Sequence, residues 1–252
     1  MSKAIHNATI MAMLHKRFGI IPNYEDILEA TYRLFIQQGH TVVDVGAHTG
    51  RHTAVFANLV GREGKVFAFE PLPYAFDLLR TRELPANVRL HSCAISEKSG
   101  PVSFVYAHGA PEESGLRVKT YNNPKEVVTE LITVESRPLD SFLNAIGRVD
   151  FIKIDAEGSE LDCIRSGSTL IRTHRPLLSV EYGYPSYSAF GNNAASLFNL
   201  AVSMGYLIGD LFGGYCSDTS TWSQVCDVAY WDWFLIPLER IDEWQSKISL
   251  SS

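Results

Sequence analysis

Val42-Val-Asp-Val-Gly-Ala-His-Thr-Gly-Arg-His-Thr53 is the stretch of sequence from which the fold can be inferred. An apolar, β-branched run leads into a loop with glycines at positions 46 and 50, and a helix-compatible segment follows. Glycine lets the backbone turn sharply and lets a ligand approach closely. The N-terminus of the helix then offers unpaired N–H groups to an anionic group. The stretch therefore predicts a strand, a ligand-binding loop and a helix, in that order.

The spacing of the glycines, together with the positions of two acidic residues, indicates which class of ligand the loop binds. The loop has the form Gly-x-x-x-Gly rather than the Gly-x-Gly-x-x-Gly of a pyrophosphate-binding loop. Asp44, at the end of the strand, would repel a pyrophosphate but would suit the ammonium group of an amino-acid-bearing ligand. Glu70 ends the next apolar run, where an acidic residue can accept hydrogen bonds from both hydroxyls of a ribose. These positions predict a ligand with an amino-acid part and a nucleoside part.

Apolar runs alternate with helix-compatible segments beyond this unit, which predicts an α/β fold with a mostly parallel sheet. The expected strands are 41–45, 65–69, 88–91, 149–154 and 177–181, and the expected helices between them are 52–60, 74–83 and 159–171. Residues 99–137 are expected to form a β-rich excursion, and residues 183–193 a loop. A helix (194–204) and two strands (206–208 and 231–236) follow. Residues 1–40, with a helix over 25–38, are expected to form a helical extension to one domain over 41–252.

Bulk composition excludes several classes of protein. The chain is 46% apolar and 20% charged, with a formal net charge of −6, and it has no basic run of the kind that binds nucleic acid. Its four cysteines form no CxxC pair. We see neither a secretory signal nor an apolar run long enough to span a membrane. We therefore expect a cytoplasmic protein without a membrane span that acts on a small-molecule or glycan acceptor and binds no nucleic acid. Whether it forms a homo-oligomer is left open by the sequence.

Two further segments are candidates for the site. Ala94 and Ile95 follow the third expected strand, where small apolar side chains can pack on an adenine ring. Around Asp155, three carboxylates and a lysine cluster where the fourth strand meets its helix, at the edge where open α/β sheets bind ligands. Glu157 and Glu160 have a second interpretation, because acidic residues also favour the first turn of a helix. Tyr182, Tyr184 and Tyr187, together with residues near Ser114-Gly115-Leu116, are candidates for the acceptor wall.

Taken together, five motifs resemble the FkbM family of methyltransferases. They are Val-Asp-Val-Gly-Ala-x-x-Gly, Ala-Phe-Glu-Pro, Leu-Asp-Ser-Phe-Leu at 139–143, Ile-Lys-Ile-Asp-Ala-Glu-Gly at 152–158 and Ser-Val-Glu at 179–181. The resemblance covers residues 41 to 182. It implies a Rossmann-like methyltransferase fold, in which a mostly parallel seven-stranded sheet has helices on both faces. It also implies S-adenosylmethionine as the donor and an oxygen as the methyl acceptor, on a sugar, a glycolipid or a natural product.

The resemblance and the loop chemistry together give a set of expected donor-binding residues. They are Asp44, Gly46, Ala47, Gly50, His52, Thr53, Glu70, Pro71, Ala94, Ile95 and Asp155.

Two mechanisms stay open for the acceptor. Either Glu181 or Asp155 is a general base that takes the proton of the acceptor hydroxyl, or Asp155 and Glu181 hold a divalent cation such as Mg²⁺ that acidifies this hydroxyl. Two other functions compete with methyl transfer. One is an inactive protein that binds S-adenosylmethionine as a regulator, and the other is a nicotinamide-dependent oxidoreductase, against which the spacing of the glycine loop argues.

Overall fold

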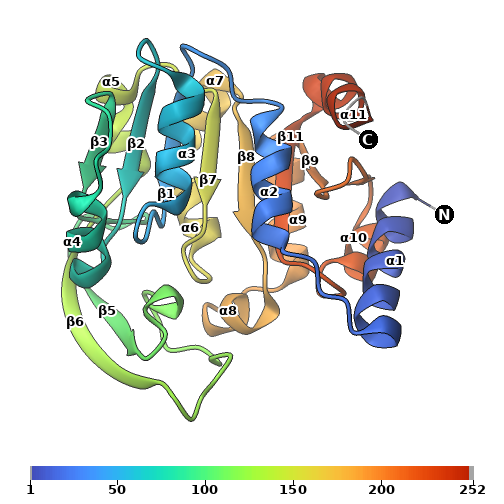
Figure 1. Cartoon of the computed structure of the whole chain (residues 1–252), viewed down its shortest axis with the longest axis horizontal. Helices are drawn as coiled ribbons and strands as arrows, with labels where there is room; N and C mark the ends of the chain where they lie inside the picture. The colour runs from blue at the N-terminus through green and yellow to red at the C-terminus, as the bar shows by residue number, and fades with distance from the viewer. Residues whose placement is uncertain (1, 250–252) are drawn as a thin grey trace.

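A computed structural model describes residues 2–249, and a large twisted sheet forms its centre (Figure 1). The strand order is β10-β9-β11-β8-β7-β1-β2-β3. These strands are β1 Thr41–Val45, β2 Lys65–Phe69, β3 Val88–His91, β7 Phe151–Ile154, β8 Leu177–Glu181, β9 Tyr206–Gly209, β10 Tyr215–Cys216 and β11 Asp232–Pro237. The expected mostly parallel sheet is confirmed, and the expected seven strands are present. The two-residue β10 is an eighth that the sequence analysis did not include.

Five neighbouring strands are parallel, in the order β3-β2-β1-β7-β8, so their carboxyl ends meet at one edge of the sheet. The register pairs Asp44 on β1 with Lys153 on β7. β11 is antiparallel and lies between β8 and β9, which places Asp232 opposite Glu181. The residues that follow β1, β2, β7 and β8 are therefore close together, although they are far apart in the sequence.

Helices cover both faces of the sheet, as expected, because the strands are apolar on both sides. They are α1 Lys3–Phe18, α2 Tyr24–Arg33, α3 Arg51–Val60, α4 Pro73–Thr81, α5 Leu143–Ile146, α6 Glu160–Ser166, α7 Ser168–His174, α8 Tyr184–Ala189, α9 Ala194–Ser203, α10 Thr219–Val225 and α11 Ile241–Ser249. One core lies between the sheet and α2, α3 and α11. The core on the other face includes residues of α1, α6, α7, α9 and α10.

A second, three-stranded sheet lies beside the main one in the order β4-β6-β5. It consists of β4 Ala94–Ile95, β5 Gly100–His108 and β6 Val128–Arg137. The β-rich excursion expected over 99–137 is therefore confirmed. Ala94 and Ile95 form a strand that the sequence analysis did not include, β4, which pairs with β6 at Ser136 and Arg137.

The first forty residues hold two capped helices. The side chain of Ser2 caps α1, and that of Asn23 caps α2. α1 contacts α10 and β10, and α2 packs in the same core as α3. The helix expected over 25–38 ends earlier, at Arg33. The division of the chain at residue 40 stays a prediction.

Several local expectations were wrong. The segment 183–193, expected as a loop, contains the short helix α8. The helix expected over 159–171 is two helices, α6 and α7, joined at Gly167, where a Cβ would lie 2.8 Å from a side-chain atom of Leu139. The sequence analysis also did not include α10 and α11. Across residues 2–249, none of these helices combines the length and apolar character needed to cross a lipid bilayer.

Candidate active site

A cavity of about 410 Å³ opens at the carboxyl ends of β1, β2, β7 and β8. Of the residues expected in the site, nine line it: Gly46, Ala47, His52, Glu70, Pro71, Ala94, Ile95, Asp155 and Glu181. Further wall residues come from α2, from residues 109–127, which connect β5 to β6, and from Phe104 and Trp231. The parallel strands therefore bring one set of expected residues together around a space of the size that binds small molecules.

The glycine loop is held against two neighbouring strands. The N–H groups of Gly46 and Ala47 both donate to the carbonyl of Phe69, at 3.0 Å. Gly46 has a φ of 78°, and a Cβ there would lie 1.7 Å from the carbonyl oxygen of Asp155. Only glycine allows this approach, so the loop fits closely between β2 and the residues after β7.

Glu70 is a buried carboxylate at the β2 end of the cavity, 5% exposed. Its two oxygens accept hydrogen bonds from the N–H groups of His48 and Leu72, both at 2.7 Å. Burial raises the pKa of Glu70 to about 7, and the two N–H donors oppose this effect. The carboxylate is therefore fixed in direction, and its remaining lone pairs are available to a ligand.

His48 offers an unpaired polar atom to the same cavity. It lines the cavity, and within residues 2–249 its buried Nε2 atom has no hydrogen-bond partner. Burial lowers the pKa of His48, which favours the neutral imidazole. A polar group of a bound ligand would supply the missing hydrogen bond to this atom.

Three expected donor-binding residues do not line the cavity. Asp44 is 1% exposed and accepts a hydrogen bond from the hydroxyl of Thr53 at 2.6 Å. Gly50 caps the start of α3 with a φ of 84°. Asp44 and Thr53 thus support the loop from behind, and direct contact of these three residues with a ligand stays a prediction.

His52 is held by two residues of α2. Its Nδ1 atom lies 2.9 Å from the hydroxyl of Tyr32, and its Nε2 atom lies 2.8 Å from a carboxylate oxygen of Glu25. The hydrogen bond to His52 lowers the pKa of Glu25. Because Glu25 also lines the cavity, α2 supplies part of the wall of the site.

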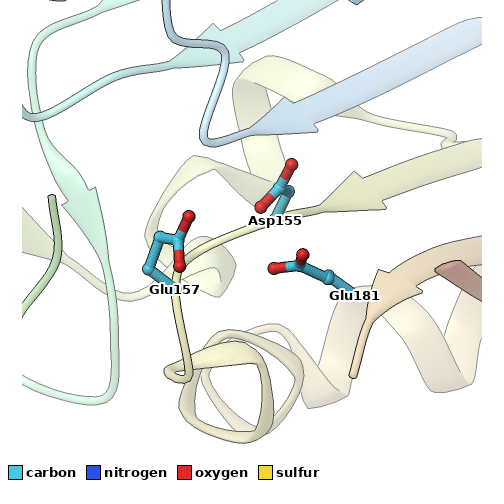
Figure 2. Close-up of side chains that lie close together, drawn as sticks. All are labelled: Asp155, Glu157 and Glu181. Atoms are coloured by element: carbon cyan, nitrogen blue, oxygen red, sulfur yellow. The ribbon is translucent and has the colours of Figure 1, made fainter. Parts of the chain in front are cut away.

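Three carboxylates converge at the other end of the cavity (Figure 2). Asp155 and Glu157 follow β7, Glu181 ends β8, and one oxygen of each lies within 4.8 Å of the others. Glu157 has a φ of 55°, which is uncommon for a residue other than glycine and is typical of functional sites. The sequence analysis included Asp155 and Glu181 and gave Glu157 two interpretations.

The three carboxylates differ in their charge environment. The Nζ atom of Lys153 lies 2.8 Å from an oxygen of Asp155. Burial opposes ionisation of Asp155, but Lys153 outweighs it and holds the pKa of Asp155 below its usual value. Burial and the nearby Asp155 charge raise the pKa values of Glu157 and Glu181. Asp155 is therefore an ionised group in an ion pair, whereas Glu181 is a proton acceptor of increased basicity.

Lys119 and Glu113, in the β5–β6 connection, complete this end of the cavity, and the sequence analysis did not include them. The Lys119 ammonium forms an ion pair with Glu157 and lies 3.5 Å from an oxygen of Glu113. Both side chains of the Lys119–Glu113 pair are only 8% exposed. The neighbouring Ser114 and Leu116, which were expected near the acceptor, also line the cavity, but no motif singles out Lys119 or Glu113.

The tyrosines expected in the acceptor wall do not form it. Tyr182 and Tyr187 are 1% exposed and pack on each other in the core. Trp231, which precedes β11, lines the cavity instead. Tyr184 is 56% exposed and does not line the cavity.

This arrangement is an α/β fold with a ligand-sized cavity at the carboxyl ends of its parallel strands. Residues 44–208, about two thirds of the chain, match the model of the methyltransferase FkbM domain. The chain therefore belongs to the FkbM methyltransferase family, as its motifs predict.

Individual relatives are more distant. The chain is 25% identical over 142 residues to Methyltransferase 1 from Beauveria bassiana and 27% identical over 154 residues to Methyltransferase sdnD from Sordaria araneosa. These matches cover 49% of this chain and 57% and 59% of the two relatives. The chain thus spans less than two thirds of the length of the curated relatives that it matches.

A solved structure, methyltransferase FkbM from Methylobacillus flagellatus KT, is 18% identical with a TM-score of 0.49. That similarity covers 89% of this chain and 47% of the other chain.

Proposed function

We propose that this protein transfers the methyl group of S-adenosylmethionine to a hydroxyl of a sugar, glycolipid or natural-product acceptor. One observation carries the proposal: a single cavity runs across four adjacent strands, with Glu70 at the β2 end and the three carboxylates at the β7 and β8 end. Two ligands can therefore bind next to each other, the donor over β1 and β2 and the acceptor beside Glu181.

The β1–β2 end fits the donor. Glu70 would accept hydrogen bonds from the ribose hydroxyls, and Ala94 and Ile95 would pack on the adenine ring. The unpaired Nε2 atom of His48 supports a polar ligand here. When bound, the donor supplies an electrophilic methyl group, and the ionised Asp155 would favour a cationic sulfonium nearby.

The carboxylate end would bind and deprotonate the acceptor. Of the two bases that the sequence left open, the structure favours Glu181, because the carboxylate of Asp155 is engaged by Lys153. A carboxylate with a raised pKa is the stronger base, and it lies at the end of a central strand that holds it rigidly. Placement of the acceptor oxygen in line with the methyl group would supply much of the rate.

The three carboxylates are less suited to binding a divalent cation than to supplying a general base. Lys153 and Lys119 already place ammonium groups on Asp155 and Glu157, so only Glu181 among the three is without a cationic partner in an ion pair within residues 2–249. A Mg²⁺ ion here would have two fixed positive charges beside it. We therefore propose that the base, rather than a metal ion, activates the acceptor.

Replacement of Glu70 by alanine is expected to weaken the binding of S-adenosylhomocysteine by ~10- to 100-fold, because hydrogen bonds to a charged acceptor are lost. Isothermal titration calorimetry measures this change. Glu97→Ala, at an exposed position outside the cavity, is the matched control and should bind as the unaltered protein does. A thermal unfolding curve for each variant shows whether the fold is retained. If a folded Glu70→Ala protein binds with unchanged affinity, the donor does not contact Glu70.

Chelation is expected to leave methyl transfer unchanged. The reaction is followed by the release of S-adenosylhomocysteine, with EDTA and with added Mg²⁺, using a panel of hydroxylated glycosides and lipids as acceptors. Loss of turnover in EDTA and its recovery with Mg²⁺ would establish the metal mechanism through Asp155 and Glu181 instead.

A further inference from the structure

The end of α1 and the residues that follow it, 16–21, expose several large apolar side chains; this segment is called the turn below. Residues 16–21 are all exposed, a run of six. Among them Phe18, Ile20 and Ile21 are 56%, 53% and 75% exposed. Three large apolar side chains exposed within four residues of the chain suggest a surface that contacts more than water.

The same turn is locally basic in an acidic protein. Residues 2–23 contain Lys3, Lys16 and Arg17 and no Asp or Glu, although the chain has 28 acidic and 22 basic side chains. Lys16 and Arg17 form no ion pair with any residue in the 2–249 range, and the guanidinium of Arg17 lies 5.6 Å from the ring centre of Phe18. The two charges are therefore unneutralised and lie directly beside the apolar side chains.

Two contacts and one peptide bond connect the turn to a residue of the cavity wall. The hydroxyl of Tyr24 lies 2.7 Å from Nε2 of His15, which closes the turn, and the ring of Tyr24 packs on Tyr230 at 5.6 Å. The next residue, Trp231, lines the cavity and is 37% exposed. In Figure 1 the turn lies at the lower right, on the side to which β7 and β8 point and where α8 lies.

We propose that this turn docks on the surface of an anionic lipid bilayer. Phe18, Ile20 and Ile21 insert between the headgroups, and Lys16 and Arg17 contact the lipid phosphates. Trp231, which lines the cavity and is 37% exposed, has the amphipathic side chain typical of the interface between membrane and water. The cavity would then open beside the bilayer.

Charge favours a lipid surface over a second copy of this chain. The centres of protein interfaces are depleted in lysine, whereas here Lys16 lies beside exposed apolar residues. A second copy would bring an equal cluster of positive charge to a symmetric contact. An anionic bilayer neutralises the cluster, and the acidic remainder of the protein is repelled from it, which orients the turn toward the lipid.

The test is co-sedimentation of the full chain with vesicles. We expect binding to vesicles of phosphatidylcholine and phosphatidylglycerol in equal parts, weak binding to phosphatidylcholine alone, and a decrease when sodium chloride is added. Lys16→Gln/Arg17→Gln and Phe18→Ser/Ile20→Ser/Ile21→Ser should each weaken binding by about tenfold or more.

Val128→Ser/Leu131→Ser on β6 is the matched control, because these residues are 70% and 71% exposed but lie outside the basic turn. This control should bind vesicles as the unaltered protein does. Equal loss in the control, unchanged binding of the turn variants, or no binding to anionic vesicles would overturn the proposal. So would self-association in sedimentation velocity that the turn variants abolish without any vesicle binding.

The proposal is independent of the proposed methyl transfer. Calorimetric binding of S-adenosylhomocysteine to the turn variants should equal that of the unaltered protein, since the turn does not line the cavity. Loss of vesicle binding with donor binding retained thus separates the two proposals.

Discussion

Replacement of Glu181 by glutamine is expected to lower kcat for methyl transfer by ~10²- to 10⁴-fold, the range over which a general base contributes. Glutamine keeps the shape of the side chain but cannot accept the acceptor proton. The measurement is the release of S-adenosylhomocysteine in the presence of an acceptor identified from the glycoside and lipid panel.

Glu112→Gln is the matched control for this substitution. Glu112 also lines the cavity, is exposed, and loses the same charge in the variant. We expect less than about a twofold change in kcat for the control, because Glu112 is exposed and is not one of the three converging carboxylates. If both variants lose activity equally, the negative potential of the cavity matters and Glu181 is not the base.

The same assignment gives a sign for the pH dependence. Burial raises the pKa of Glu181, and Asp155 raises it further, so the carboxylate is protonated at low pH and cannot act. The rate should therefore rise with pH as Glu181 loses its proton, and the Glu181→Gln protein should lack this rise. A sulfonium cation bound nearby would lower the pKa of Glu181, so kcat should reach its plateau at a lower pH than kcat/KM for the donor.

Replacement of Gly46 by alanine is expected to lower the free energy of unfolding by at least about 3 kcal/mol and to abolish donor binding, because the new Cβ overpacks a backbone contact. The added atom would lie 1.7 Å from the Asp155 carbonyl oxygen, and the residue would keep a φ of 78°. Either the loop moves away from β7 or the two strands separate. Chemical denaturation and calorimetry with S-adenosylhomocysteine measure the two effects.

Gly191→Ala separates the cost of the close contact from the cost of the backbone angle. Gly191 has a φ of 74°, and a Cβ there would have nothing within 4 Å. We expect the control to lose only about 1 kcal/mol, the cost of the left-handed conformation. Equal losses at the two positions would mean that the loop yields easily and that the close approach is not required.

The sequence was sufficient for the parts of the fold that depend on local patterns. The apolar runs that form β1, β2 and β8 have the residue types and lengths of buried parallel strands, and each was predicted within the bounds observed. The positions of the glycine loop and Glu70 were also predictable, because the loop directly follows β1 and Glu70 directly follows β2. Boundaries that depend on tertiary contacts, such as the break at Gly167, were not.

The contacts that complete the cavity could not be predicted in the same way. Glu25, Lys119 and Glu113 come from α2 and from the β5–β6 connection, far from the motifs in the sequence. Charged residues in a helix or a polar loop usually face solvent, so their type alone gives no reason to place them in a site. The contact of Asp44 with a ligand, which its motif suggests, stays a prediction: one carboxylate oxygen accepts from Thr53, and the other is buried without a partner within residues 2–249.

The small second sheet has a consequence for how acceptor preference can change. Its strand β4 places Ala94 and Ile95 at the proposed donor end of the cavity, whereas the connection between β5 and β6 carries Lys119 and Glu113 to the proposed acceptor end. The β5–β6 ladder, from the Gly100–Ser136 pair to the His108–Val128 pair, separates these two ends. The connection over residues 109–127 can therefore change in length and charge, by evolution or by design, without a change in β4. Such changes would alter which acceptors fit the cavity and leave the proposed donor end as it is.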